Sequence, residues 1–154
     1  MTTRTVETEQ ARDSLHQFID AQKLPMTVSI ERGKVRSTKQ NKLQRKWINE
    51  IAEQRGDVTP EEIRGYCKLS FGVPILCESS EMFDQRWRLI TQDMSPEQKL
   101  NLMMEPMDMG ITRNMTTKQK KEYLDRIARH FSQQGIELTD PETLGLEAID
   151  RNAA

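Results

Sequence analysis

Helix-start signals recur through most of this chain, and they constrain its fold more than any other feature. In a capping box, a Ser or Thr and a Glu or Gln three residues later satisfy each other's free backbone amides. This spacing occurs three times, and a Ser-Pro-Glu start supplies a fourth helix; the four starts are Ser37–Gln40, Thr59–Glu62, Ser95–Glu97 and Thr116–Gln119. Apolar residues at helical spacing follow each start, so residues 37–135 are predicted to form a mainly helical body.

The first third of the chain has a different pattern. Thr3–Glu7 and Met26–Glu31 alternate polar and apolar residues, as half-buried strands do. Between them, Gln10–Gln22 places Leu15, Phe18 and Ile19 at helical spacing. Residues 2–33 are therefore predicted to form a strand-helix-strand unit. The expected fold class is α+β, with this short unit followed by the helical body.

The length of 154 residues fits a single domain, 1–154. Gly72-Val73-Pro74 predicts a break in the helical body, and residues 136–154 are expected to form a loosely ordered tail. Hydrophobic residues make up 35% and charged residues 31%, which is a low apolar content for a stable monomer of this size. Self-association is therefore expected to bury part of the apolar surface.

Several classes of function find little support in the residue types. No run approaches the ~20 apolar residues of a membrane span, so we expect a cytoplasmic protein without membrane contact. Cys67 and Cys77 lie far in sequence from both histidines, which predicts free, partly buried thiols and neither a metal site nor a cofactor. The chain is not expected to be an enzyme. The carboxylates that a metal-dependent nuclease would need are Glu50, Glu53, Asp57, Glu61 and Glu62, and such residues at helix ends are usually solvated or act as caps.

Charge is strongly segregated along the chain. Seven of the fifteen residues from Arg32 to Lys46 are basic and none is acidic, although the net charge of the protein is −1. Without those seven charges the remaining 139 residues carry −8. A solvated helix face usually mixes charges of both signs, so the run favours a polyanionic partner, DNA or RNA, over a purely solvating role.

On a helix that runs from Ser37 to about Arg55, the basic residues share one side and the apolar residues the other. A second group of lysines, at 118, 120 and 121, opens the helix after Thr116, and Thr117-Lys118-Gln119 repeats Thr38-Lys39-Gln40. Two helix starts would then present amides and lysines to phosphates, although coincidence between two capped helices also explains so short a repeat. Gln40 has two readings, as a DNA contact or as a structural cap.

Single-stranded DNA is the first candidate ligand, because unpaired bases stack on aromatic rings. Trp87, between Arg86 and Arg88, is the best candidate for stacking, whereas Trp47 is expected in the core. Six of the nine methionines lie between Met94 and Met115. This Met-rich segment fits either core or dimer packing or an adaptable surface for a protein partner.

The run Arg36–Lys42 (RSTKQNK) resembles a motif of the NinB/Orf recombination proteins of lambdoid phages, which has Arg-Ser, two residues, Gln-Asn and a basic residue. Residues 115–119, continuing to Tyr123-Leu124-Asp125, look closer still to the YbcN-like prophage members of that group. The resemblance covers roughly residues 3–141. These proteins place a tryptophan four residues after the Asn, where this chain has Arg45.

The resemblance implies a homodimeric α+β protein that prefers single-stranded DNA, assists loading of a recombinase and contacts the host single-strand-binding protein. YbcN-like members are also described as flipping bases. We therefore expect a noncatalytic accessory protein of phage recombination, with a structure-specific endonuclease and a Met-rich protein adaptor as alternatives. The predicted DNA-binding residues are Arg32, Lys34, Arg36, Lys39, Gln40, Asn41, Lys42, Arg45, Lys46, Lys118, Lys120 and Lys121.

Overall fold

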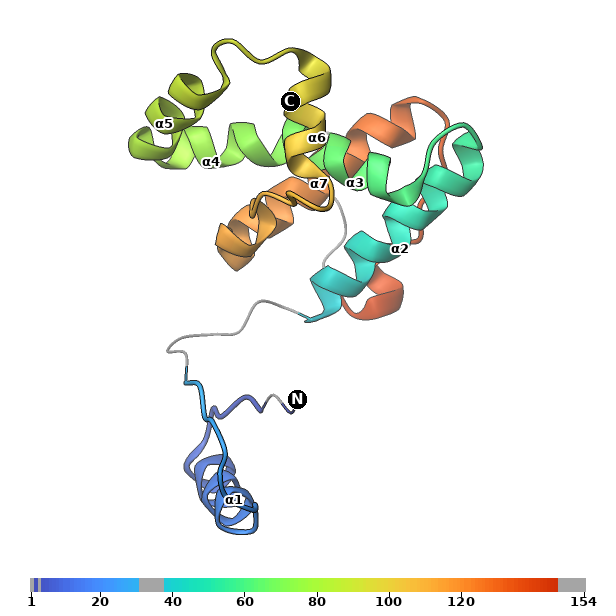
Figure 1. Ribbon diagram of the computed structural model, residues 1–154. Helices are drawn as coiled ribbons and strands as arrows, with labels where there is room; N and C mark the ends of the chain where they lie inside the picture. Colours follow the sequence, from blue (N-terminus) through green and yellow to red (C-terminus); the bar gives the residue numbers. More distant parts are fainter. Residues whose placement is uncertain (1, 3, 31–37, 147–154) are drawn as a thin grey trace. The chain divides into compact units, whose positions relative to one another are not determined.

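A computed structural model describes residues 2, 4–30 and 38–146 (Figure 1). The chain divides into two compact units, Met1–Val35 and Arg36–Ala154. We call them the amino-terminal unit and the body, and each is described by itself.

Residues 4–30 of the amino-terminal unit form one helix, α1 (Glu9–Asp20). Thr8 caps it, since the Thr8 hydroxyl accepts a hydrogen bond from the Ala11 amide at 3.1 Å. The predicted helix over Gln10–Gln22 is thus confirmed to within two residues at its end. No residue of α1 is buried, and the Arg4 guanidinium lies 4.0 Å from the centre of the Phe18 ring.

The two predicted strands are wrong, and with them the α+β fold class. Residues 4–7 and 26–30 are not strands, and the described part of the chain contains only helices, turns and irregular segments. Thr3 and Glu31 lie outside the described residues. Alternation marks a strand only where a neighbouring strand supplies the hydrogen bonds and a core covers one face. Neither is present among the described residues of this unit, where 53% of Val28 and 82% of Ile30 are exposed.

The body is helical, as predicted. Capping boxes form at Thr59 and Thr116, and Ser95 forms a third with Gln98; Ser37 lies outside the described residues. The α-helices are α2 (Thr38–Arg55), α3 (Pro60–Cys67), α4 (Val73–Ser79), α5 (Glu81–Thr91), α6 (Pro96–Met103) and α7 (Thr117–Gln133). The shorter elements are a π-helix, η1 (Lys68–Gly72), and two 3₁₀ turns, η2 (Thr112–Asn114) and η3 (Pro141–Leu144).

The break predicted at Gly72-Val73-Pro74 does not occur. Helix α3 continues through η1 into α4 without interruption, as the continuous green ribbon in Figure 1 shows. In a regular α-helix a proline ring clashes with the carbonyl four residues earlier. The π-helix is wider, and the Val73 amide donates to the carbonyl of Lys68, five residues back. The chain therefore passes Pro74 by widening the helix rather than by ending it.

The core of the body lies mainly between α2, α3, α4 and α7. Its largest fully buried side chains include Trp47, Tyr123 and Phe131. Two residues of the Met-rich segment, Met103 and Met115, belong to this core, whereas 67% of Met107 is exposed. Met94, Met104 and Met109 are half-buried, so most methionines of the segment pack against the body. No helix in the described ranges is long and apolar enough to cross a membrane.

Residues 136–146 are held against α2, although the sequence indicated a loosely ordered tail there. The Trp47 indole N–H donates to the Thr139 carbonyl at 2.8 Å. The Glu50 carboxylate accepts from both the amide and the hydroxyl of Thr139, at 2.9 and 2.7 Å. Gln54 exchanges two hydrogen bonds with the backbone of Glu137. We call residues 136–146 the strap.

Candidate nucleic-acid interface

The first half of α2 presents a basic surface. Lys39, Lys42, Arg45 and Lys46 are exposed, and Asn41 lies exposed beside them. None of these four cations forms an ion pair with a carboxylate among the described residues, whereas Arg64, Arg88 and Arg126 each do. We call these four residues the basic face of α2. Their charge is not neutralised locally, so it remains available to an anionic partner.

The periodicity of α2 explains why the basic face points outward. Leu43, Trp47 and Ile51 recur every four residues and are at most 1% exposed, so they fix the buried side of the helix. The basic residues occupy the opposite side, as the sequence predicted. The remaining predicted cations of the run, Arg32, Lys34 and Arg36, lie outside the described residues.

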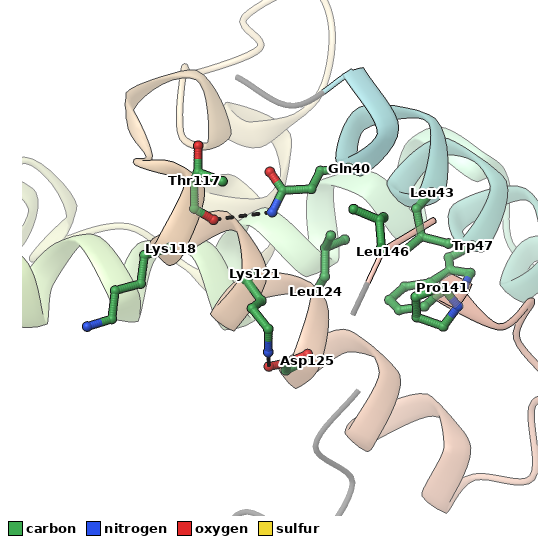
Figure 2. Close-up of a pocket in the computed structure, with 10 residues that line it drawn as sticks. All are labelled: Gln40, Leu43, Trp47, Thr117, Lys118, Lys121, Leu124, Asp125, Pro141 and Leu146. Atoms are coloured by element: carbon green, nitrogen blue, oxygen red, sulfur yellow. Dashed lines mark hydrogen bonds and ion pairs between the residues drawn. The ribbon is translucent and has the colours of Figure 1, made fainter. Parts of the chain in front are cut away.

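The structure brings together the two helix starts that share a Thr-Lys-Gln sequence. The Gln40 side-chain amide donates to the Thr117 carbonyl at 3.2 Å, which links the beginnings of α2 and α7 (Figure 2). Gln40 is only 5% exposed. The hydrogen bond to Thr117 supports a structural role for Gln40. Gln40 also lines the pocket described next.

A pocket of about 490 Å³ lies between α2, α7 and the strap (Figure 2). Most of the wall surface is apolar, although half of the lining residues are polar or charged. The apolar residues are Leu43, Trp47, Leu124, Pro141 and Leu146, and the polar ones are Gln40, Thr117, Lys118, Lys121 and Asp125. A pocket of this size is within the range of sites for small-molecule ligands. We call it the α2–α7 pocket.

The basic face of α2 reaches this pocket at the end of the strap. A Cβ atom placed on Gly145 would come within 3.1 Å of the Lys39 ammonium nitrogen, so the two groups are close neighbours. Gly145 directly precedes Leu146, which lines the pocket. Gly145 also has a φ of +72°, a conformation that favours glycine.

The three predicted lysines of α7 have different environments. Lys118 is exposed and lines the α2–α7 pocket. Lys121 is half-buried and pairs with the buried Asp125 at 3.1 Å. Lys120 is 1% exposed; its ammonium donates to the Gln44 side-chain oxygen and lies 5.3 Å from the centre of the Tyr123 ring. Lys120 therefore holds α7 to α2 and does not reach the surface.

Lys118 and Lys121 also line a second, more open hollow on the body, together with Ser79, Thr116 and Glu122. The first two turns of α7 thus form a ridge between two depressions.

Trp87, the predicted stacking residue, does not line the α2–α7 pocket. It is half-buried and lines another groove with Val73, Pro74 and Lys99. Of its flanking arginines, Arg88 pairs with Asp84 at 2.9 Å, and Arg86 is exposed. The structure thus does not place this aromatic in the pocket beside the basic face.

The carboxylates considered for a nuclease mostly have structural partners. Glu50 binds the strap, Glu61 pairs with Arg64 at 3.0 Å, and Glu62 completes a capping box. Within residues 4–30 and 38–146, no group of three or more Asp, Glu, His or Cys side chains could hold a metal ion. Both cysteines are free, as predicted, and burial raises the pKa of the Cys67 thiol well above its usual value.

Sequence reasoning missed the strap and therefore the pocket. Trp47 was correctly assigned to the buried side of α2, but its partner Thr139 is 92 residues away. Pro141 and Leu146 had no periodic signal of their own. Only the repeat of Thr-Lys-Gln at two helix starts hinted that α2 and α7 begin side by side.

Comparisons of the chain with protein-family models, with curated proteins and with solved structures give no match.

Proposed function

We propose that this protein binds single-stranded DNA without catalysing a reaction on it, with the basic face of α2 on the phosphates. The observation that carries the proposal is the set of four exposed, unneutralised cations on α2, of which Lys39 lies close to the end of the strap that lines the α2–α7 pocket. Phosphates need the cations, and unpaired bases need apolar or aromatic surfaces. Duplex DNA offers the phosphates but keeps its bases stacked inside, so the pocket favours a single strand.

In this proposal one base leaves the stack and enters the α2–α7 pocket. The cost of unstacking is a few kcal/mol and is smallest for bases that are already unpaired. Leu43, Leu124 and Pro141 supply apolar contacts. Lys118, which lines the pocket, and Lys39, whose ammonium nitrogen lies near Gly145, would hold the phosphates that flank the inserted base.

The proposed biological role follows the resemblance to the NinB/Orf proteins, which stays a prediction. In that role the protein acts in the cytoplasm of a bacterial host as an accessory to phage or prophage recombination. Its further partners would be a recombinase and the host single-strand-binding protein. The role is carried by the sequence motif alone, whereas the DNA-binding proposal also has the support of the basic face and the pocket.

Fluorescence anisotropy across a salt series tests the proposal. The wild type should bind single-stranded DNA more tightly than matched duplex, with a slope of log affinity against log salt of about −3 to −4, from four to six phosphate contacts at ~0.7 each. The Lys39→Glu, Lys42→Glu, Lys46→Glu variant should lose most of its affinity and about 2 units of slope.

A matched control carries the same change in charge elsewhere: Lys23→Glu, Arg86→Glu, Arg113→Glu, three exposed cations without ion pairs in the described structure. This control should keep a slope close to that of the wild type. Equal losses in both triple variants would mean that net charge alone governs binding. A flat salt response of the wild type would contradict the proposal.

The fluorescence of 2-aminopurine within a single strand tests the role of the pocket, because this base brightens when it leaves the stack. Binding of the wild type should change its fluorescence. Leu124→Phe adds a ring to the pocket wall and should reduce that change while leaving the salt slope intact. Leu89→Phe, at an exposed position on α5, should behave as the wild type.

A further inference from the structure

The α2–α7 pocket has a buried carboxylate in its wall. Asp125 is 7% exposed, and its ion-pair partner in the described structure is Lys121, at 3.1 Å (Figure 2). A carboxylate offers about four lone-pair sites, and this ion pair occupies one of them. A buried charge is costly unless hydrogen bonds satisfy it. The remaining acceptor sites of Asp125 are therefore suited to hydrogen-bond donors of a ligand.

Asp125 and Lys121 line both the α2–α7 pocket and the second hollow of the body. In the second hollow the other carboxylates, Glu78 and Glu122, already pair with Arg126. In the pocket, by contrast, Asp125 and Lys121 are accompanied by apolar side chains of α2, α7 and the strap. A planar ring with a polar edge fits this arrangement, because its faces need apolar contacts and its edge needs hydrogen bonds.

The acceptors and the donor on this wall match the edge of one DNA base. On its Watson–Crick edge, guanine carries two neighbouring donors, N2–H and N1–H, followed by the acceptor O6. The two oxygens of Asp125 can accept from the two donors. The Lys121 ammonium, which lies beside Oδ2 of Asp125, can donate to O6. Proteins that take a base out of the stack commonly read it through this edge.

The other three bases match this wall less well. Adenine and cytosine each place a ring-nitrogen acceptor beside their amino group, and its lone pair would face an oxygen of Asp125. Thymine has a single N–H between two carbonyl oxygens. Each of these bases would donate one hydrogen bond to the carboxylate and suffer repulsion next to it. A phosphate offers no donor and would be repelled by Asp125.

We infer that the α2–α7 pocket selects guanine, and that Asp125 determines this specificity. Where the guanine belongs to a DNA strand, the inference rests on the proposed function and deepens it. A free guanine nucleoside carries the same Watson–Crick edge. The experiments below therefore use both sources of the base.

Fluorescence anisotropy of short thymidine strands with one variable central base tests the selection. The wild type should bind a strand with a central dG about tenfold more tightly than strands with dA, dC or dT there, a factor typical of a good bidentate contact to a base. The salt slope should be the same for all four strands, because their phosphates are the same.

Two base analogues test the reading of the edge without any change to the protein. Hypoxanthine lacks the 2-amino group of guanine, and 2-aminopurine lacks both N1–H and O6. Each should lose most of the tenfold preference. Equal binding of guanine and hypoxanthine would overturn the inference, because Asp125 would then not accept from both donors.

Asp125→Asn replaces one acceptor by a donor and keeps the shape of the side chain. This variant should lose the preference for guanine and favour adenine, whose amino group and ring nitrogen match an amide. Glu122→Gln makes the same change of charge in the second hollow and should keep the preference. A preference for guanine that survives in Asp125→Asn would overturn the role of Asp125. Thermal unfolding checks that both variants fold, and the analogue measurements stand without them.

Isothermal titration of the full-length protein with deoxyguanosine and with deoxyadenosine separates the two sources of the base. A strand preference for dG with weak binding of the free nucleosides would place the guanine in DNA. Selective binding of deoxyguanosine by a protein without salt-dependent strand binding would support the selection and contradict the proposed function. Equal binding of all four strands at a normal salt slope, together with equal binding of the two nucleosides, would overturn the inference and leave the proposed function intact.

Discussion

At the scale of single residues, neighbouring lysines of the same helix have opposite roles. Lys118 and Lys120 both fall in the first turns of α7, and the sequence placed both in the DNA site. Lys120 is buried between Gln44 and the Tyr123 ring, whereas Lys118 is exposed at the pocket. Two residues along a helix correspond to a rotation of about 200°, so adjacent charges need not share a surface.

This difference predicts opposite effects of alanine substitution. Lys120→Ala removes a buried hydrogen bond and the packing of its side chain, so the free energy of unfolding should fall by about 1–3 kcal/mol. Lys118→Ala should stay within about 0.5 kcal/mol of the wild type, yet lower the salt slope of DNA binding by ~0.7. Urea unfolding and anisotropy measure the two effects. A loss of slope in a stably folded Lys120→Ala protein would contradict the assignment.

Asp108 is predicted to make the stability of the body sensitive to acid. Its carboxylate accepts from the ammonium of the buried Lys68 at 2.8 Å and from the Arg64 guanidinium at 2.6 Å. These hydrogen bonds, that of Lys68 foremost, lower the pKa of Asp108. The charged form is thus favoured in the folded state. The resulting stability is present above the unfolded pKa of about 3.9 and is lost as pH falls through the lower, folded value.

Asp108→Asn should therefore lower the free energy of unfolding at neutral pH by about 1–2 kcal/mol, because Lys68 stays buried without its carboxylate partner. Below about pH 4 the difference in the free energy of unfolding between Asp108→Asn and the wild type should shrink, since Asp108 of the wild type becomes protonated and loses its charge. Part of the acid dependence should remain, because Arg64 lowers the pKa of Glu61 in the same way. Asp93→Asn, at an exposed position, serves as the control. A difference that is constant from neutral to acidic pH would contradict this account.

At the scale of elements, α2 combines two tasks along its length. Its first half carries the basic face, and its second half binds the strap through Glu50 and Gln54. Because the strap supplies Pro141 and Leu146 to the pocket, the second half of α2 positions one wall of the proposed site. A change far from the cations is therefore expected to affect the pocket.

Glu50→Ala removes the acceptor of the Thr139 amide and hydroxyl, and hydrogen bonds to charged groups are typically worth about 1.5–3 kcal/mol. We expect the Thr139 amide to lose its protection from hydrogen exchange and the 2-aminopurine response to diminish, while the salt slope is unchanged. Glu53→Ala, an exposed position three residues later, should change none of these. Unaltered exchange at Thr139 in Glu50→Ala would show that the strap is held by other contacts.

The sequence predicted the helices whose signals lie within a few neighbouring residues. It failed where the structure depends on residues that are far apart in the chain. Capping boxes and apolar periodicity reside within a few residues, so α2, α3, α6 and α7 were placed correctly. The alternation at Met26–Ile30 was misread because a strand depends on a partner that local sequence does not reveal. Pro74 was misread as a break because the π-helix that accommodates it, Lys68–Gly72, has no periodic signal in the sequence. The basic face was predicted because its charges lie within one short run of the sequence. The pocket was not predicted, because its walls come from α2, α7 and the strap.

At the scale of the whole molecule, the two units differ in the surfaces that they present. The core cluster of the described residues lies within the body, and the unneutralised cations on α2 do as well. Residues 4–30 of the amino-terminal unit carry three basic and four acidic side chains, and no residue of α1 is buried. The proposed binding to DNA would then depend on the body and not on the amino-terminal unit.

The prediction that follows separates the two units. The Lys39→Glu, Lys42→Glu, Lys46→Glu variant should lose most of its affinity for single-stranded DNA, whereas Phe18→Asp, in the amino-terminal unit, should bind with the affinity and the salt slope of the wild type. Fluorescence anisotropy across a salt series measures both variants. A loss of affinity in Phe18→Asp would mean that α1 contributes to the DNA site itself.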